Sequence, residues 1–563
     1  HGLTVAAIFR NMRLADAAKV LKVNQLSQEL PQGKVYRPFS LLGVDAKTFV
    51  AENRPKLADN EWAIKDVLPV TDSQALDIRA TVNKPRTSVQ YTYLLSGPSG
   101  FNRAQLIFAC NQLVRANDIL RTVFIEHESK FLQVVLESLE VPVVEHTAFN
   151  DLEQSVREIC NAHAESHEAF RLGAPFLHFF IVEGKDGREG FVIALSHAQY
   201  DGVSLPNLLR DLEAMYTGLS TVGSVPLSLY VAHTRDEAVL SKAVSYWSKL
   251  LKGSSLSILE GQSIPAGKAL FRTKTVDGAK QLPQHITTAS LLSAAWGLVL
   301  ARRLKTMDVA FGGITGGRTI DSMPDAEKVQ GPCYQFTPIR IPFQSQWTAT
   351  DLLEFVQRQS AESMAYDFVG WDIISKQCTD WAASGHTFFD SIVHHQDWED
   401  FDELPFAGQL CKVGILNPHS DAAYPLKLVS FVKKGVLNVG VVGSESDKEL
   451  IESVLGELAS AVSELAALSE NPLFNEAPKA VEAEPIPARK AASLLEVPIG
   501  QAKSSPTDGT ATPESPVEGA PPLKQATSHP LLGSSRKAKS KHTRRLMSLE
   551  KLWRAIKRKV RHH

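Results

Sequence analysis

From Val67 to about Leu473 the sequence alternates strand-like and helix-like segments, with no linker-like gap longer than a loop. Gly190–Ser196 (GFVIALS) is apolar and contains β-branched residues, as a buried strand should. Ser204–Tyr216 follows as an amphipathic helix, with Ser204 placed as its N-cap. Such alternation over a long stretch is typical of the α/β class.

Composition narrows the class of protein further. Of the 563 residues, 44% are apolar and 22% are charged, which indicates a globular chain with a sizeable core. No window approaches eighteen uncharged apolar residues, so a transmembrane helix is excluded, and the N-terminal run does not resemble a secretory signal. The five cysteines are scattered without a CxxC pair, which argues against disulfides and zinc and favours a cytoplasmic location.

The C-terminal part of the sequence has a different character. Glu476 to Gly533 holds ten prolines and no aromatic residue, which predicts disorder. From Ser534 onward the charge is +11, whereas the rest of the chain carries −13. A helical spacing of apolar residues within this basic tail predicts an amphipathic helix, formed by Leu546, Leu549, Trp553, Ile556 and Val560. Such a tail fits an anionic membrane, an acidic partner or a solvated appendage, and no nucleic acid is expected.

One loop carries the side chains best suited to chemistry. His197 follows the apolar strand, and Asp201-Gly202 makes a turn before the helix that starts at Ser204. This order presents one imidazole where the backbone leaves a sheet, and histidine is the side chain that exchanges a proton near neutral pH. Asp201 suits an ion pair with an arginine that holds the loop. Taken alone, the pattern also fits a histidine and a turn with structural roles only.

Other candidate sites have less support. His394 and His395 are adjacent in a strand-like segment, so their side chains should point to opposite faces and cannot share one ion; no metal site is expected. The sequence has no GxSxG motif, which leaves a thioesterase-type serine unsupported. Ser196 precedes His197 on the strand and should point away from it.

In its wider context the histidine loop resembles that of a known family. Ser196–Ser204 is similar to the SHxxxDxxS motif of terminal condensation-like domains of fungal nonribosomal peptide synthetases, where ordinary condensation domains carry HHxxxDG. Further segments resemble the family's other motifs in the right order: Val67–Gln74, Arg115–Phe124, Phe311–Arg318, Gln330–Arg340 and Phe389–Gln396. Together these matches make the resemblance specific.

Three positions depart from the family pattern. Asn117-Asp118 replaces a His-Glu pair, Gln335 stands where the family has Asn, and Met364–Trp371 replaces a PYEHxG segment. None of these departures touches His197 or Asp201, so they bear on substrate choice rather than on activity.

The resemblance implies a particular domain organisation. His1–Lys19 looks like the last helix of a thiolation (carrier) domain that lacks its phosphopantetheine-bearing serine, as in the C-terminal piece of a larger synthetase. The fold implied is α/β, with two tandem lobes like chloramphenicol acetyltransferase and an active-site tunnel between them. The expected divisions are a carrier remnant at 1–30, a linker at 31–66, lobes at 67–221 and 222–472, a disordered linker at 473–533 and a basic tail at 534–563.

The resemblance also implies a reaction. A carrier-bound peptidyl thioester would be released by attack of an amine, most simply one in the same peptide, to give a cyclic product such as a siderophore or other cyclic peptide. His197 would be catalytic, and the loop would be supported by Asp201, Gly202 and Arg318. Substrate contacts are expected from Ser196, Ser204, Gly331, Gln335 and His395.

The expected partners follow from the same resemblance. The chain would bind no cofactor of its own, because the phosphopantetheine arm arrives on an upstream thiolation domain. The adenylation and other domains of the same synthetase would be the further partners. Three alternatives stay open: an ordinary internal condensation domain, intermolecular release by an external amine or alcohol, and a noncatalytic module that docks carriers.

Overall fold

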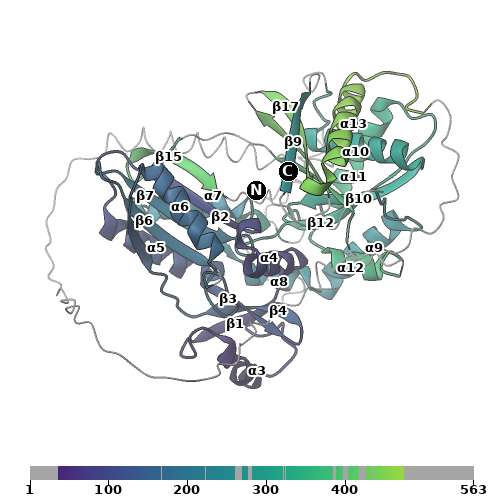
Figure 1. Cartoon of the computed structure of the whole chain (residues 1–563). Helices are drawn as coiled ribbons and strands as arrows, with labels where there is room; N and C mark the ends of the chain where they lie inside the picture. The colour runs from purple at the N-terminus through teal and green to yellow at the C-terminus, as the bar shows by residue number, and fades with distance from the viewer. Residues whose placement is uncertain are drawn as a thin grey trace, which may run out of the picture.

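The computed structural model describes residues 36–166, 168–221, 223–259, 269–276, 282–320, 323, 325–383, 388–396, 403–416, 426–433 and 435–474. These residues form two lobes, each built on a six-stranded sheet (Figure 1). The expected α/β class and two-lobed architecture are confirmed. The expected carrier remnant at 1–30, the proline-rich segment from Glu476 to Gly533 and the basic tail lie outside the described residues.

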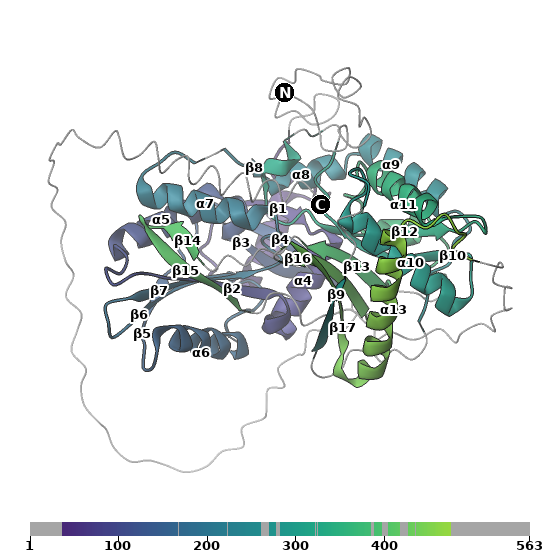
Figure 2. The ribbon, with the colours of Figure 1, turned by 90° about the horizontal axis from the view of Figure 1, so that it is seen from above.

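Helices cover both faces of the N-terminal sheet. In spatial order its strands are β14 (Glu403–Phe406), β15 (Gln409–Leu416), β2 (Val89–Leu95), β7 (Glu189–Ser196), β6 (Leu177–Glu183) and β5 (Val143–Thr147). α6 (Leu152–Glu165) lies on one face, and α5 (Arg103–Ala116) and α7 (Ser204–Thr217) lie on the other (Figure 2). This double cover explains why β2 and β7 are buried along their whole length.

Two strands of this sheet come from the C-terminal half of the sequence. β15 pairs antiparallel with β2, and Figure 1 shows it in green beside the blue strands of the N-terminal lobe. The expected division of the lobes at residue 222 therefore has to be corrected, because residues 403–416 belong to the first sheet. β2 would otherwise present an open edge, and β15 covers it.

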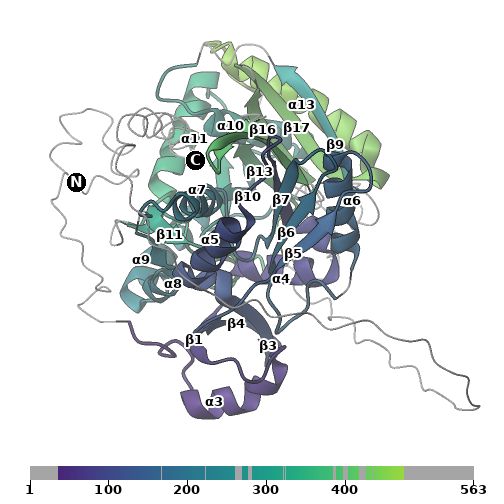
Figure 3. The same ribbon diagram turned by 90° about the vertical axis from the view of Figure 1, so that its left-hand side faces the viewer.

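The segment expected to be a linker, 31–66, is folded where the structure describes it. α3 (Ala46–Asn53) starts after Asp45, whose carboxylate accepts a hydrogen bond from the amide of Thr48. It packs on a small sheet of β1 (Ile64–Pro69), β4 (Lys130–Leu136) and β3 (Thr122–His127) (Figure 3). The helix buries little beyond Phe49 and Asn53, so its sequence lacks the apolar stripe that predicts a helix.

The C-terminal sheet has helices on one face. Its strands, in spatial order, are β12 (Gln335–Pro342), β10 (Asp308–Thr315), β13 (Ser391–Gln396), β16 (Leu426–Lys433), β17 (Val436–Ser444) and β9 (Ala269–Val276). β10, β13 and β16 are parallel to one another. α10 (Thr288–Leu304), α11 (Ala349–Ser363) and α13 (Lys448–Ala466) form an apolar cluster with this sheet. α10 and α13 lie on the side away from the N-terminal lobe (Figure 2).

Further elements connect the two lobes. They are α4 (Asp72–Asn83), the short parallel pair β8 (Val225–Pro226) and β11 (Val329–Gln330), α8 (Leu227–Thr234), α9 (Glu237–Leu251) and α12 (Trp371–Gln377). One apolar cluster contains buried side chains of both lobes, such as Leu94 and Ala310.

The second lobe extends beyond its expected end at residue 472. Phe474 packs edge-on against Phe343, with 5.4 Å between the ring centres. Among the described residues, no helix has the length and apolar character needed to cross a membrane.

Candidate active site

His197 lies where the two lobes meet. It directly follows β7, and its backbone amide donates a 2.8 Å hydrogen bond to the carbonyl of Ser88, next to β2. Its ring stacks on Tyr200 of the same loop at 4.8 Å, and the ring of Tyr334, just before β12 of the C-terminal lobe, is also 4.8 Å away. The imidazole side chain keeps 19% of its surface exposed, so substrate can reach it.

A buried carboxylate lies beside the imidazole. Oδ2 of Asp77, on α4, is 3.7 Å from Nδ1 of His197. Asp77 also accepts hydrogen bonds from the hydroxyls of Tyr334 at 2.5 Å and Ser88 at 3.0 Å. Burial raises the pKa of Asp77 above its usual value, and His197 and the two hydroxyls oppose that rise. The distance to Nδ1 exceeds a hydrogen bond, so Asp77 acts on the ring through its charge and not through a shared proton.

Asp77, Tyr334 and Ser88 were not among the residues expected from the sequence. A signal for Asp77 was present, because it follows Ser73 of the motif segment Val67–Gln74 by four residues on one helix and therefore shares a helix face with it. No local signal marked Tyr334, which reaches Asp77 from 257 positions away in the sequence.

We expect Asp77→Asn to slow catalysis while leaving the fold intact. The amide keeps the size of the carboxylate and can still accept from Tyr334 and Ser88, but it removes the charge beside the ring. An opposite charge near 4 Å is worth about 1 to 4 kcal/mol in partly exposed surroundings, so the loss should be about tenfold or more. Single-turnover release of a carrier-bound thioester measures it. Asp211→Asn, at a buried carboxyl on α7, is the control; equal rates for wild type and Asp77→Asn would contradict the prediction.

Asp201 is engaged by an ion pair that joins the loop to the C-terminal lobe. It is 3% exposed, and both of its carboxylate oxygens accept from Nη2 of Arg318, at 2.9 and 2.7 Å. The backbone amides of Cys333, Ser204 and Val203 also donate to it, at 2.9, 2.8 and 3.1 Å. Burial alone would raise the pKa of Asp201, but Arg318 and the amides lower it below the usual value. The expected pairing of Asp201 with Arg318 is thus present in the structure.

Glycines bring Arg318 into this position. Gly317 has φ +63°, and a Cβ atom there would lie 1.9 Å from the carbonyl oxygen of Cys333, so only glycine allows this approach. The guanidinium then donates to three main-chain carbonyls, those of Ala326, Val329 and Gly331. Gly331 itself has φ +133°. Gly331, expected to contact substrate, therefore also anchors Arg318 through its carbonyl.

The two serines of the loop hold its backbone. Ser196 is fully buried, with its hydroxyl 2.7 Å from that of Thr81 and accepting from the amide of Ala198. Ser204 is also fully buried, and its hydroxyl accepts from the amide of Asp201 at 2.9 Å. Both hydroxyls therefore make structural contacts, and the substrate contacts expected of the two serines stay a prediction. Ser204 is also not the N-cap of α7: the cap is Val203, and the carboxylate of Asp201 binds the first amides instead.

The other loop-support and substrate-contact residues expected from the sequence, Gly202, Gln335 and His395, differ in burial and in hydrogen bonding. Gly202 is exposed at the loop surface, and nothing lies within 4 Å of a Cβ atom built there. Gln335 is 2% exposed, and among the described residues its Oε1 has no hydrogen-bond partner. Nδ1 of His395 lies 2.8 Å from the hydroxyl of Ser430.

The two histidines of β13, His394 and His395, lie on opposite faces of the sheet, and the expected substrate contact of His395 stays a prediction. Val393 belongs to the cluster under α10 and α13, whereas Ile392 belongs to the cluster shared by both lobes. Because side chains alternate along β13, His395 shares the face of Val393, and His394 shares the face of Ile392. The histidine turned toward the N-terminal lobe is therefore His394.

Two of the other motif segments support the same loop. In the segment Val67–Gln74, Gln74 donates to the carbonyl of Ala198 at 3.0 Å, and Ser73 donates to the carbonyl of Tyr334 at 2.7 Å. From the segment Arg115–Phe124, the carbonyl of Ile119 accepts from the side chain of Gln199 at 2.8 Å. Motifs far apart in the sequence thus converge on the residues around His197.

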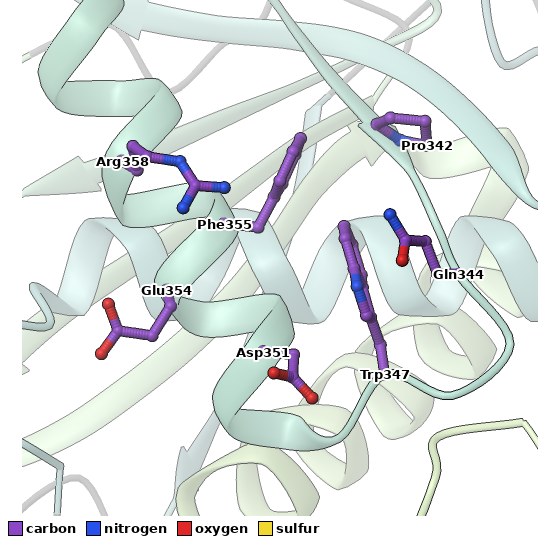
Figure 4. Close-up of a pocket in the computed structure, with 7 residues that line it drawn as sticks. All are labelled: Pro342, Gln344, Trp347, Asp351, Glu354, Phe355 and Arg358. Carbon is purple, nitrogen blue, oxygen red and sulfur yellow. The ribbon is translucent and has the colours of Figure 1, made fainter.

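A hollow of about 310 Å³ lies elsewhere, beside α11. It is lined by Pro342, Gln344, Trp347, Asp351, Glu354, Phe355 and Arg358 (Figure 4). None of the residues around His197 borders it, so it is separate from the candidate active site. Among the described residues there is also no group of three or more side chains suited to hold a metal ion.

A second buried carboxyl group, that of Asp367, lies beside the motif segment Phe311–Arg318. Asp367 is 4% exposed, and burial raises its pKa to about 8, although hydrogen bonds from Gly317 and Thr315 oppose the rise. Because the folded pKa exceeds the unfolded one, the folded state binds this proton more tightly, and stability falls as pH rises from about 4 through 8.

Asp367→Asn should remove this pH dependence. One pKa unit corresponds to about 1.4 kcal/mol, so we expect the variant to be more stable than wild type at pH 9 by about 1 kcal/mol or more. The difference should shrink toward pH 4. Denaturant unfolding of both proteins at pH 4.5 and pH 9 measures it, and a difference that is the same at both pH values would contradict the assignment.

Two mixed α/β lobes hold one histidine at their junction, on a loop fixed by a buried ion pair. The family model of the condensation domain matches residues 64–478. The chain belongs to the condensation-domain family of nonribosomal peptide synthetases, acyltransferases that form amide bonds.

The relatives are fungal synthetases. The chain is 55% identical over 478 residues to the nonribosomal peptide synthetase sidD of Aspergillus fumigatus, covering 84% of this chain and 22% of that protein. It is 35% identical over 478 residues to nonribosomal peptide synthetase 1 of Ajellomyces capsulatus, covering 84% of this chain and 26% of the relative. The chain thus spans about a quarter or less of the length of these relatives.

Solved structures share the fold. A crystal structure described as CT matches with a TM-score of 0.68 and 24% identity, covering 78% of this chain and 100% of that one. The holo T3CT structure matches with a TM-score of 0.67 and 24% identity, over the same shares of the two chains. The condensation domain from the Monacolin K polyketide synthase MokA gives a TM-score of 0.58 at 14% identity, covering 73% and 100%.

Proposed function

We propose that this chain releases a carrier-bound peptidyl thioester by amide-forming attack of an amine, with His197 as the catalytic residue. The observation that carries the proposal is the position of His197, partly exposed at the meeting of the lobes with the Asp77 carboxylate beside Nδ1. The SHxxxDxxS pattern of the loop supports the terminal class, in which the attacking amine belongs to the same peptide and the product is cyclic.

His197 has the chemistry that this step needs. The amine nitrogen attacks the thioester carbonyl, a C–N bond forms, the C–S bond breaks, and the carrier thiol leaves. A free α-amine has a pKa of about 8, so a good part of it is unprotonated near neutral pH and needs positioning more than full deprotonation. His197 orients the amine, takes the proton that it loses, and returns a proton to the leaving thiolate. The Asp77 carboxylate stabilises the imidazole while it carries the positive charge.

Asp201 has a structural role in this proposal. Arg318 and three backbone amides already use its oxygens, so it has little capacity left for proton transfer. It holds the His197 loop against Arg318 of the C-terminal lobe.

The substrate reaches His197 on a phosphopantetheine arm carried by an upstream thiolation domain. The other domains of the same synthetase supply the peptide. We place the reaction in the cytoplasm, in keeping with five cysteines that are all free and buried. The residues that we propose to face the substrate are His197, Tyr334 and, from the C-terminal sheet, His394; Gln335 and Gly331 are further proposed contacts.

Mass analysis of the released product tests the proposal. An upstream carrier domain is loaded with a linear peptidyl thioester, and the chain is added as wild type or with His197 replaced. We expect a product one water lighter than the free peptide acid, formed only when His197 is present. Free acid would indicate hydrolysis, and a product that incorporates an added amine or alcohol would indicate intermolecular release. Absence of any release, with surrogate amines also refused, would contradict the proposal and favour a docking module.

A further inference from the structure

Tyr334 reaches the candidate active site from the C-terminal lobe and contacts two of its groups at once. The residue lies just before β12, and its ring is 4.8 Å from that of His197. Its hydroxyl donates a 2.5 Å hydrogen bond to the carboxylate of Asp77 on α4. One side chain thus touches both the imidazole and the carboxylate that lies beside it.

The backbone around Tyr334 is held by two further hydrogen bonds. The hydroxyl of Ser73, one turn before Asp77 on α4, donates to the carbonyl of Tyr334 at 2.7 Å. The amide of the preceding residue, Cys333, donates to the carboxylate of Asp201 at 2.9 Å. These contacts fix the main chain on either side of the phenol, so the fold itself brings the hydroxyl to Asp77.

The surroundings of Asp77 oppose its negative charge. Burial raises the pKa of this carboxyl group above its usual value, and three groups oppose the rise: His197 through its charge, and then Tyr334 and Ser88 through hydrogen bonds. Tyr200 also interacts electrostatically with Asp77, but burial keeps the pKa of its phenol well above the usual value, so it stays neutral. The charge of Asp77 therefore depends on a small number of neighbours.

The two hydroxyls stabilise the ionised form of Asp77. A donor that binds a carboxylate favours the charged state and lowers the pKa of the group. The bond from Tyr334 is the shorter of the two, at 2.5 Å against 3.0 Å from Ser88. Short hydrogen bonds to a charged acceptor are the strong ones. Without the Tyr334 hydroxyl, Asp77 would be protonated and uncharged over a wider range of pH.

We propose that the hydroxyl of Tyr334 is a positioning group that keeps Asp77 ionised and oriented beside His197. Tyr334 acts through Asp77, and the bonds of the thioester and the amine form and break without its hydroxyl. Because Tyr334 belongs to the C-terminal lobe, that lobe contributes to the charge that the imidazole experiences. This inference deepens the proposed function and rests on it for the role of His197.

Tyr334→Phe tests the inference, because it removes the hydroxyl and keeps the ring beside His197. We expect the single-turnover rate of release, followed from about pH 5.5 to about pH 9, to fall about three- to tenfold at the acid end and to approach the wild-type rate at the basic end. The sign follows from Asp77: without the hydroxyl its pKa rises further, so its charge is lost at a pH where wild type retains it. A rate loss that is equal at every pH would contradict the inference.

The Asp77→Asn background separates this role from a purely structural one. If the hydroxyl acts through the charge of Asp77, Tyr334→Phe should slow release by less than about twofold once that charge is absent. The same fold loss in both backgrounds would overturn the inference. Ser88→Ala, which removes the longer hydrogen bond, should give a smaller loss with the same pH dependence, and it decides the matter if Tyr334→Phe does not fold.

Tyr93→Phe provides a matched control. The hydroxyl of Tyr93, on β2, also donates to a carboxylate, that of Glu153 on α6, at 2.7 Å. Glu153 also forms an ion pair with Lys412 of β15. Tyr93→Phe should leave the rate of release and its pH dependence unchanged. Comparable melting temperatures of Tyr93→Phe and Tyr334→Phe will show that the loss of rate is not a loss of fold.

The titration of Asp77 gives a readout that does not require release. NMR of chains labelled with carbon-13 at aspartate follows the Asp77 carboxyl signal, which is assigned by its absence in Asp77→Asn. The signal should titrate at higher pH in Tyr334→Phe than in wild type and should be unchanged in Tyr93→Phe. Identical titrations in wild type and Tyr334→Phe would overturn the inference. If wild type releases no peptide, the proposed function fails, and this titration alone decides the role of Tyr334.

Discussion

Replacement of His197 by alanine should lower the rate of peptidyl release by about 10²- to 10⁴-fold and leave the chain folded. A positioned side chain that transfers a proton in the transition state contributes about this much. The imidazole has 19% of its surface exposed and contacts Tyr200 and Tyr334 through ring packing, so its removal should cost the fold little. Rapid-quench single-turnover kinetics give the rate, and thermal unfolding gives the stability.

His285→Ala provides the matched control for this prediction. His285 is also partly exposed and also lies beside a carboxylate, that of Glu354, but it belongs to the C-terminal lobe next to α11. We expect its replacement to leave the rate of release unchanged. Comparable rate losses in the two variants, or a His197→Ala variant as fast as wild type, would contradict a catalytic role for His197.

Replacement of Asp201 or Arg318 by alanine should destabilise the fold by about 3 to 5 kcal/mol, which is the usual effect of removing one partner of a buried ion pair. Loss of Asp201 leaves the buried Arg318 guanidinium and three backbone amides without their acceptor. The melting temperature should then fall by roughly 10 °C. Because this ion pair joins the two lobes, the rate of release should fall as well. Gly202→Ala, at an exposed position with space around it, is the control.

A double-mutant cycle measures the interaction free energy between Asp201 and Arg318. The Asp201→Ala, Arg318→Ala double variant should lose less stability than the sum of the single variants, because neither charge is then left buried alone. The lowered pKa of Asp201 also sets the sign of the pH effect: its stabilisation is complete above the unfolded value near 3.8 and is lost as pH falls through the folded value. Equal stability losses in His197→Ala and Asp201→Ala would contradict the separation of their roles.

Much of the site could be predicted because local patterns encode it. The buried strand expected at Gly190–Ser196 is β7, Glu189–Ser196, and the helix expected at Ser204–Tyr216 is α7, Ser204–Thr217. A strand covered on both faces must be apolar throughout, and a helix on its surface must carry one apolar stripe, so these elements show in the sequence. The histidine loop between them was visible for the same reason.

The sequence could not show which face of a strand meets the other lobe, nor which segments pack against each other. The choice between His394 and His395 requires knowing which face of β13 meets the other lobe, and the sequence contains only the alternation. The helix α3 was missed because only Phe49 and Asn53 are buried, and two residues are too few to give the sequence a helical periodicity of apolar side chains.

The sequence by itself determined the α/β class, the motif order, and a histidine placed at the end of a buried strand. Each of these depends on residues that are close in the chain. Only the tertiary structure decided that β15 covers the edge of β2 in the first sheet and that Tyr334 and Asp77 meet beside His197. These contacts join segments up to hundreds of residues apart, and their partners are selected by the closure of the two lobes, which no local pattern records.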